Sequence, residues 1–355
     1  MTEMTTHERM KRMYEHREAD RVPITDSPWE TTVKRWNREG MPENTNWIDY
    51  FDVDKIYSFS VDTSPHYERK IIEETDRYVI YTTDWGVTIK SFKNATSTPE
   101  CLDFKLKTAE AWEEAFSRMS TEDERIPIEK LKKLYPKWRA EGAWVFGTFW
   151  FGFDVTHARM MGTEDTLVAM LEEPEFMRHI FDCQLERNIK MFERAWELGF
   201  RLDEAFWYDD MGYKGTPFFS PQIYRDVLKP YHKKLVDWAH NHGIVARLHS
   251  CGNIMPLLPD VVDTGVDALN PLEVKAGMDP INLKKEYGDK LVLHGGINAL
   301  SWNDADVILD EIKQKLPILK ENGGYIFSTD HSIPDNVSLE TMTKVINEVK
   351  ELTKY

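Results

Sequence analysis

A histidine and a cysteine stand two residues apart in the stretch RLHSCGN, as His249 and Cys251. Imidazole nitrogen and thiolate sulfur are both ligands that zinc prefers, usually within a set of four. Residues i and i+2 of a strand share one face, so a strand ending here would present both donors together. The pair therefore indicates a metal site, and the alternative is a buried cysteine beside a hydrogen-bonded histidine.

Other polar residues follow strand-like runs in the same way. They are Asp26, Asp209, Asp210, Glu273, Asn298 and His331. In parallel α/β folds the active site lies at the carboxyl ends of the strands, because those ends meet at one face. We therefore expect these side chains to converge, with Asp26, Asp209 and Asp210 in one cavity as catalytic residues. The alternative for each residue is that it caps the following helix.

The elements that must position these residues alternate regularly from residue 144 onward. Strand-like runs cover Trp144–Phe149, Glu204–Asp210, Ile244–Ser250, Val266–Glu273, Leu291–Asn298 and Tyr325–His331, with helical patterns between them. One helix should begin with Ser220 as its N-cap and Pro221 at its first position. With the earlier runs Arg21–Ser27 and Lys55–Asp62 there are eight strands, which predicts a (β/α)8 TIM barrel. The alternative is a doubly wound open sheet, although no glycine-rich phosphate fingerprint supports it.

The N-terminal third departs from this rhythm. Residues Thr6–Ala19 suggest a short helix, and the β-branched and aromatic residues of Ile71–Phe92 suggest a β-meander. We expect one TIM-barrel domain over residues 1–355, with the N-terminal helix and the meander forming an insertion over about residues 1–110.

The composition narrows the classes of function. The chain has 355 residues, a formal net charge of -16, and 41% hydrophobic residues. Such a charge repels nucleic acid and anionic lipid, so neither is an expected partner. Three widely spaced cysteines do not form a disulfide framework. No secretion signal or membrane-length apolar run is visible, so we expect a cytoplasmic protein.

Four stretches resemble the uroporphyrinogen decarboxylase superfamily when taken in order. They are LHSCGN, SPQIYRDVLKPYHKKL, LHGGIN and GGYIFSTDHSIPDNVS, and the meander resembles the N-terminal insertion of that superfamily. The resemblance implies a TIM barrel. It also implies one of two activities, porphyrinogen decarboxylation or zinc-dependent methyl transfer linked to a corrinoid.

The resemblance favours the methyltransferase branch. The decarboxylases carry arginines in an N-terminal motif, whereas this chain reads ITDSPWETT, with Asp26 but with Trp29 and no arginine. The methyltransferases use a His-x-Cys pair and a distant cysteine after the last strand. His249 and Cys251 match the pair, and His331 stands at the distant position. The resemblance thus implies Zn²⁺ on His249, Cys251 and His331.

Replacing a thiolate by His331 leaves the zinc more positive and therefore a stronger Lewis acid. That favours removal of a methyl group from an aromatic methyl ether, as the methyltransferase component of an O-demethylase. The sequence lacks the Asp-x-His-x-x-Gly corrinoid motif, so the cobalamin is expected on a separate corrinoid protein. The expected substrate contacts are Trp29, Phe151, Tyr208, Glu273 and Asn298.

Several alternatives stay open. Another methylcobamide-linked reaction would use a thiol, a methylamine or a folate. A decarboxylase and a non-catalytic or corrinoid-binding barrel are the others. The sequence also leaves open the fourth zinc ligand and whether the chain forms a homodimer.

Overall fold

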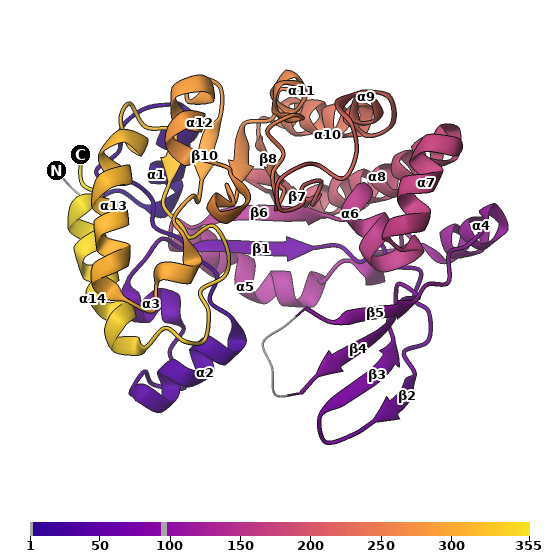
Figure 1. The fold of residues 1–355 in the computed structure, drawn as a ribbon, viewed down its shortest axis with the longest axis horizontal. Coiled ribbons are helices and arrows are strands. Elements are labelled where there is room, and N and C mark those ends of the chain that lie inside the picture. Colours follow the sequence, from indigo (N-terminus) through magenta and orange to yellow (C-terminus); the bar gives the residue numbers. More distant parts are fainter. Residues whose placement is uncertain (1–2, 94–97) are drawn as a thin grey trace.

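The computed structural model describes residues 3–93 and 98–355 and is built on a curled parallel sheet (Figure 1). Its seven strands run in the order β1-β6-β7-β8-β9-β10-β11, and every neighbouring pair is parallel. The strands are β1 (Ile56–Ser60), β6 (Trp144–Phe149), β7 (Glu204–Tyr208), β8 (Val245–His249), β9 (Ala268–Asn270), β10 (Val292–His294) and β11 (Tyr325–Ile326). The α/β class and the parallel sheet are therefore confirmed.

The first expected strand, Arg21–Ser27, forms an isolated bridge instead of a ladder. Ile24 pairs in parallel with Phe327, and the Phe327 N–H donates to the Pro23 carbonyl over 2.9 Å. On its other side, the Asp54 N–H donates to the Ile24 carbonyl over 3.0 Å. The segment thus lies between β11 and the residues before β1. Pro23 has no N–H to donate, which limits how far this pairing can extend.

Most of the helices surround the sheet (Figure 1). They are α1 (Thr6–Tyr14), α2 (Glu30–Glu39), α3 (Trp47–Phe51), α4 (Ala109–Arg118), α5 (Ile128–Ala140), α6 (Phe153–Thr156), α7 (Thr163–Glu172), α8 (Pro174–Glu197), α9 (Pro221–Ile223), α10 (Lys229–Asn241), α11 (Leu258–Asp263), α12 (Pro280–Tyr287), α13 (Ala305–Leu319) and α14 (Leu339–Leu352). Ser220 caps α9 as expected, since its hydroxyl accepts from the Ile223 N–H. Pro174 separates α7 from α8 because proline disfavours helical backbone at the residue before it.

Helix α1 closes the amino end of the curled sheet. Met10 and Met13 are 1% and 0% exposed and share a cluster with Trp144, Val292 and Ile326 from three strands. The buried Arg9 holds the helix in place through Asp20 and Asp54, at 2.7 and 2.6 Å. With this end filled, a ligand site between the strands has to open at the carboxyl end.

The expected β-meander is a separate antiparallel sheet that projects from the main sheet (Figure 1). Its strands are β2 (Ile71–Glu74), β3 (Tyr78–Thr82), β4 (Thr88–Phe92) and β5 (Glu100–Asp103), so it runs one strand beyond the expected range. Within residues 3–93 and 98–355, no helix combines the length and the apolar character that crossing a bilayer requires.

Candidate metal centre

Three potential ligands meet at the ends of two neighbouring strands. Asp210 follows β7, His249 ends β8, and Cys251 comes two residues later; their ligand atoms all lie within 4.8 Å of one another. The Nε2 atom of His249 is 3.4 Å from the Cys251 sulfur and 3.6 Å from Asp210 Oδ1. Ligand pairs on a tetrahedral zinc stand about 3.3–3.6 Å apart. The two distances from His249 therefore match those between ligands of a tetrahedral zinc ion.

A hydrogen bond turns the His249 ring into the orientation that a ligand needs. Its Nδ1 is 2.6 Å from Asn270 Oδ1, while the Asn270 amide donates to the His294 carbonyl over 3.4 Å. The hydrogen therefore sits on Nδ1, and the Nε2 lone pair faces Cys251. Burial lowers the pKa of His249, which favours the neutral ring that binds metal. Asn270 was not among the expected site residues.

The loop after β8 fixes the thiol. The Cys251 N–H donates to Asp210 Oδ1 over 2.8 Å, and the Gly252 N–H donates to Glu273 Oε2 over 2.6 Å. Gly252 has φ +77°, and a Cβ there would lie 2.2 Å from the Gly212 carbonyl carbon. Burial, followed by the charges of Asp210 and Glu273, raises the pKa of Cys251. A bound cation is thus what would make this sulfur a thiolate.

An aromatic wall stands beside the three ligands. The ring centroid of Tyr208 is 4.7 Å from that of His249, and Trp150 stacks on Tyr208 at 5.7 Å. The Arg159 guanidinium lies 4.6 Å from the Trp150 centroid. A planar ring would pack well against this wall. Tyr208 was expected at the site, whereas Trp150 and Arg159 were not among the expected contacts, since Phe151 was chosen from the aromatic stretch around the end of β6.

Two polar groups of the segment after β6 lack hydrogen-bond partners in the described chain. The Nε2 of His157 and the Nε of Arg159 are buried and make no hydrogen bond to any described residue, although His157 Nε2 lies 3.8 Å from Asp154 Oδ1. Burial lowers the pKa of His157 to about 4. Burial, with the charges of Asp210 and Asp209, raises the pKa of Asp154 to about 7. These groups can serve a polar ligand, since an unsatisfied buried polar atom otherwise destabilises the fold.

Asp209 is placed differently from its neighbour. It is 0% exposed, and it accepts from the Asp154 N–H and from His232 Nε2, each at 2.7 Å. Burial raises the pKa of Asp209, and the contact with His232 opposes that shift. Its carboxylate therefore anchors the start of α6 instead of facing a cavity with Asp26 and Asp210. The sequence alone could not show that Asp209 and Asp210, which are adjacent, have different surroundings.

Asp26, Trp29 and His331 gather around the residues that follow β11. Asp26 accepts from the Thr329 N–H and hydroxyl at 3.1 and 2.7 Å, and burial raises its pKa to about 6. The rings of Trp29 and His331 are 6.0 Å apart. His331 is exposed and lies outside the group of three donors, although its charge helps to lower the pKa of His249.

The side chains of Phe151 and Asn298 contribute to packing and to helix capping. Phe151 is 0% exposed and packs on Trp207 and His232. Asn298 Oδ1 accepts from the Leu300 N–H over 3.1 Å and so caps the short helical turn Ala299–Ser301. These placements do not support the expected substrate contacts at either residue. Sequence could not show this, because a strand-end position does not reveal whether a side chain meets the cavity or a helix.

Comparisons with known proteins agree with this architecture. No curated protein matches the chain. Among solved structures, a methyltransferase from Methanosarcina mazei superposes with a TM-score of 0.67 at 16% identity, covering 98% of this chain and 99% of that one. The GH26 domain of a Prevotella bryantii endo-β-mannanase/endo-β-glucanase reaches only 0.42 at 11% identity, covering 99% and 98%, and carries no argument.

At 16% identity the superposition shows a shared fold alone, whereas the match to a family model also assigns the chain to a family. The family model described as "Uroporphyrinogen decarboxylase (URO-D)" matches residues 155–352, which include the candidate ligands His249 and Cys251. Because this match covers more than half of the sequence, the chain belongs to the uroporphyrinogen decarboxylase family.

Proposed function

We propose that this protein is a zinc-dependent methyltransferase that takes a methyl group from an aromatic methyl ether and passes it to a separate corrinoid protein. The observation that carries the proposal is the convergence of Asp210, His249 and Cys251 beside the Trp150–Tyr208 wall. A methyltransferase among the structural neighbours supports the reaction class.

In this proposal Asp210, His249 and Cys251 would hold the zinc. His331, which lies outside this group in the structure, would have to approach it to supply a further ligand. A bound zinc ion would act as a Lewis acid on the ether oxygen and lower the free-energy barrier to its departure as phenolate. With Asp210 as a ligand the site has two anionic donors instead of one. Carboxylate oxygen is a harder donor than thiolate, so the site remains more electrophilic than one with two thiolates.

The protein residues orient the ether. Tyr208 and Trp150 pack against the aromatic ring, which places the oxygen near the three ligands. The unpaired polar atoms of His157 and Arg159 bind ring substituents. The methyl carbon then points out of the carboxyl end of the sheet, which is where a large corrinoid protein can approach. Positioning of this kind contributes to rate because the reacting atoms are already aligned.

Anaerobic assays with a panel of methoxybenzenes and cob(I)alamin test the proposal. We expect methyl transfer by the zinc-loaded protein, its loss after chelation, and its recovery when zinc is added back. Normal demethylation by the metal-free protein would contradict the proposal. So would rapid methylation of a thiol from methylcobalamin with no turnover of any aryl ether.

Methylation of a thiol is the second candidate, and one observation favours it. With the Asp210 carboxylate and the Cys251 thiolate as ligands, the zinc site would be formally neutral. The sequence argument for an ether substrate assumed a positively charged site with His331 in place of a thiolate, so neutrality weakens it. The same assay distinguishes the two reactions, because each uses the corrinoid in the opposite direction.

A further inference from the structure

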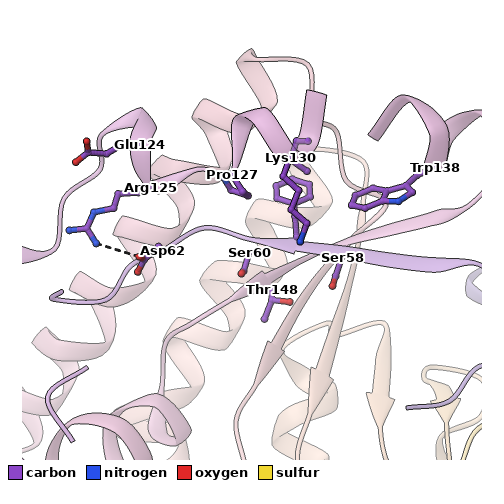
Figure 2. Close-up of a pocket in the computed structure, with 11 residues that line it drawn as sticks. Ser58, Ser60, Asp62, Glu124, Arg125, Pro127, Lys130, Trp138 and Thr148 are labelled. Atoms are coloured by element: carbon purple, nitrogen blue, oxygen red, sulfur yellow. Dashed lines mark ion pairs between the residues drawn. The ribbon is translucent and has the colours of Figure 1, made fainter. Parts of the chain in front are cut away.

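A cavity of about 470 Å³ lies beside β1, at a distance from the three ligands of the candidate metal centre. Figure 2 shows its walls: Ser58 and Ser60 of β1, Thr148 of β6, and Lys130, whose side chain extends from α5 toward β1. Cavities of this size hold small organic molecules in other proteins. The proposed methyl transfer uses none of these residues.

The cavity presents hydrogen-bond donors that the described chain leaves unused. Thr148 is 7% exposed, yet its hydroxyl and those of Ser58 and Ser60 make no hydrogen bond to another described residue. Lys130 forms no ion pair within residues 3–93 and 98–355. The Thr148 hydroxyl is not among the fully buried unpaired atoms of the described residues, so it is open to the cavity and available to a ligand.

Arg125 adds a second cationic group. It is 8% exposed, and its two terminal nitrogens donate to the Ser64 and Arg118 carbonyls at 3.0 and 3.1 Å. Its Nε is buried and has no partner among the described residues. Asp62 only partly offsets this charge: it lies 3.7 Å from Arg125 Nη1, and it is also paired with His66 and the Ser64 N–H (Figure 2).

These groups select the chemistry of a ligand. Ammonium and guanidinium groups can only donate, and hydroxyls can also donate, so the matching group is rich in acceptors, as an oxyanion is. The remaining walls include Trp138, Phe59 and Leu131, which are apolar and buried. A ligand that satisfies both parts carries an oxyanion on an apolar body.

The strand register separates this cavity from the metal centre. Thr148 is level with Phe206, whereas His249 is level with Tyr208, two residues further along β7. Thr148 also lies two strands away from His249 in the sheet order. Given strand spacings of about 4.8 Å and a rise of about 3.3 Å per residue, the backbone positions of Thr148 and His249 are roughly 12 Å apart.

We propose that the cavity beside β1 binds a small organic anion, with its oxyanion on Lys130, Arg125 and Thr148 and its apolar body against Trp138. This site is distinct from the metal centre, and it does not depend on the methyl-transfer reaction. Carboxylates and phosphate esters share the required chemistry.

Isothermal titration calorimetry on the full chain with benzoate, phenyl phosphate and inorganic phosphate tests this site. The titrations use both zinc-loaded and zinc-stripped protein, since a carboxylate can also bind zinc. We expect saturable binding of at least one probe in both forms. Lys130→Gln and Thr148→Val should each weaken it at least about tenfold, a difference of about 1.4 kcal/mol. Lys133→Gln, an exposed position on the same helix that does not line the cavity, should leave it unchanged.

The probes also separate the sources of the anion. Binding of benzoate alone identifies a carboxylate ligand, and binding of phenyl phosphate alone identifies a phosphate ester. Saturable binding of none of them overturns the proposal, as does equal affinity in wild type, Lys130→Gln and Thr148→Val. Circular dichroism of each variant establishes that it is folded. Because the stripped protein is measured too, a failure of the proposed zinc chemistry leaves this result interpretable.

Discussion

Asn270 orients His249 as a ligand, because its amide oxygen accepts a hydrogen bond from Nδ1, the ring nitrogen that faces away from Cys251. The 2.6 Å contact between Nδ1 and Oδ1 leaves Nε2 free for metal. We predict that Asn270→Ala lowers zinc affinity about 10- to 100-fold, as loss of such a partner typically does. Competition with a chromophoric chelator measures it.

Asn298→Ala provides the matched control for that substitution. Asn298 also ends a strand region, but its side chain caps a helical turn and does not touch the three ligands. We expect its zinc affinity to equal that of wild type. If Asn270→Ala also bound zinc as tightly as wild type, the orientation of His249 by Asn270 would be wrong.

His157 should make stability depend on pH. Its pKa in the fold is about 4, below the 6.5 of an exposed histidine, since burial disfavours the charged ring. Between these values the unfolded chain binds a proton that the folded chain does not. Stability is therefore full above 6.5 and falls as the pH drops toward 4.

We predict that lowering the pH from about 7.5 to about 5 reduces the free energy of unfolding of the zinc-stripped wild type. This reduction should be about 2 kcal/mol larger than the reduction in zinc-stripped His157→Gln. Stripping the zinc keeps metal release from adding to the effect. Urea unfolding at both pH values measures it. Equal losses in the two proteins would mean that His157 is not buried as a neutral ring.

At the scale of elements, the loop that follows β8 depends on two backbones in close contact. A Cβ on Gly252 would meet the backbone of Gly212 at 2.2 Å, and neither chain segment can move without shifting Cys251. We predict that Gly252→Ala lowers zinc affinity at least about tenfold, because a small displacement of one ligand disrupts tetrahedral geometry. Zinc titration of the folded variant measures this.

Gly243→Ala is the control for backbone strain. Gly243 also has positive φ, at +67°, but nothing lies within 4 Å of the added Cβ. It should lose about 1–2 kcal/mol of stability from the left-handed backbone alone and keep its zinc affinity. Wild-type zinc affinity in Gly252→Ala would show that the loop can relax away from Gly212.

At the scale of the whole molecule, stability and chemistry are divided between the two ends of the sheet. The buried cluster under α1 lies at the amino end, and the candidate ligands lie at the carboxyl end. We predict that Met13→Ala lowers the free energy of unfolding by about 2–5 kcal/mol, the usual loss for a large buried side chain. Zinc bound per folded chain should not change.

Denaturant unfolding and elemental analysis of the same preparation check this separation. A loss of zinc from folded Met13→Ala would mean that the amino end and the metal centre are coupled. The division follows from parallel topology, in which loops at the carboxyl ends vary while the opposite end is packed.

The sequence by itself determined the repeating architecture and the spacing that brings His249 and Cys251 together. Alternating strand and helix patterns are local, and they correctly placed seven parallel strands and the cap at Ser220. They did not show that Arg21–Ser27 forms only an isolated bridge in place of an eighth strand. His249 and Cys251 could be paired because the two-residue period of a strand is also local. The separate meander was predictable for the same reason. Turn residues and runs of β-branched residues are recognised within a few consecutive positions of the sequence.

Only the tertiary structure decided which partners these residues meet. Asp209 and Asp210 are adjacent in sequence, yet one lies buried under α6 and the other faces His249. Asn270 and Trp150 join the site from the ends of β9 and β6, Arg159 joins it from the helical turn after α6, and the cavity beside β1 combines β1, β6 and α5. Strand register, sheet curvature and helix packing set these contacts between distant segments, and a pattern of neighbouring residues does not encode them.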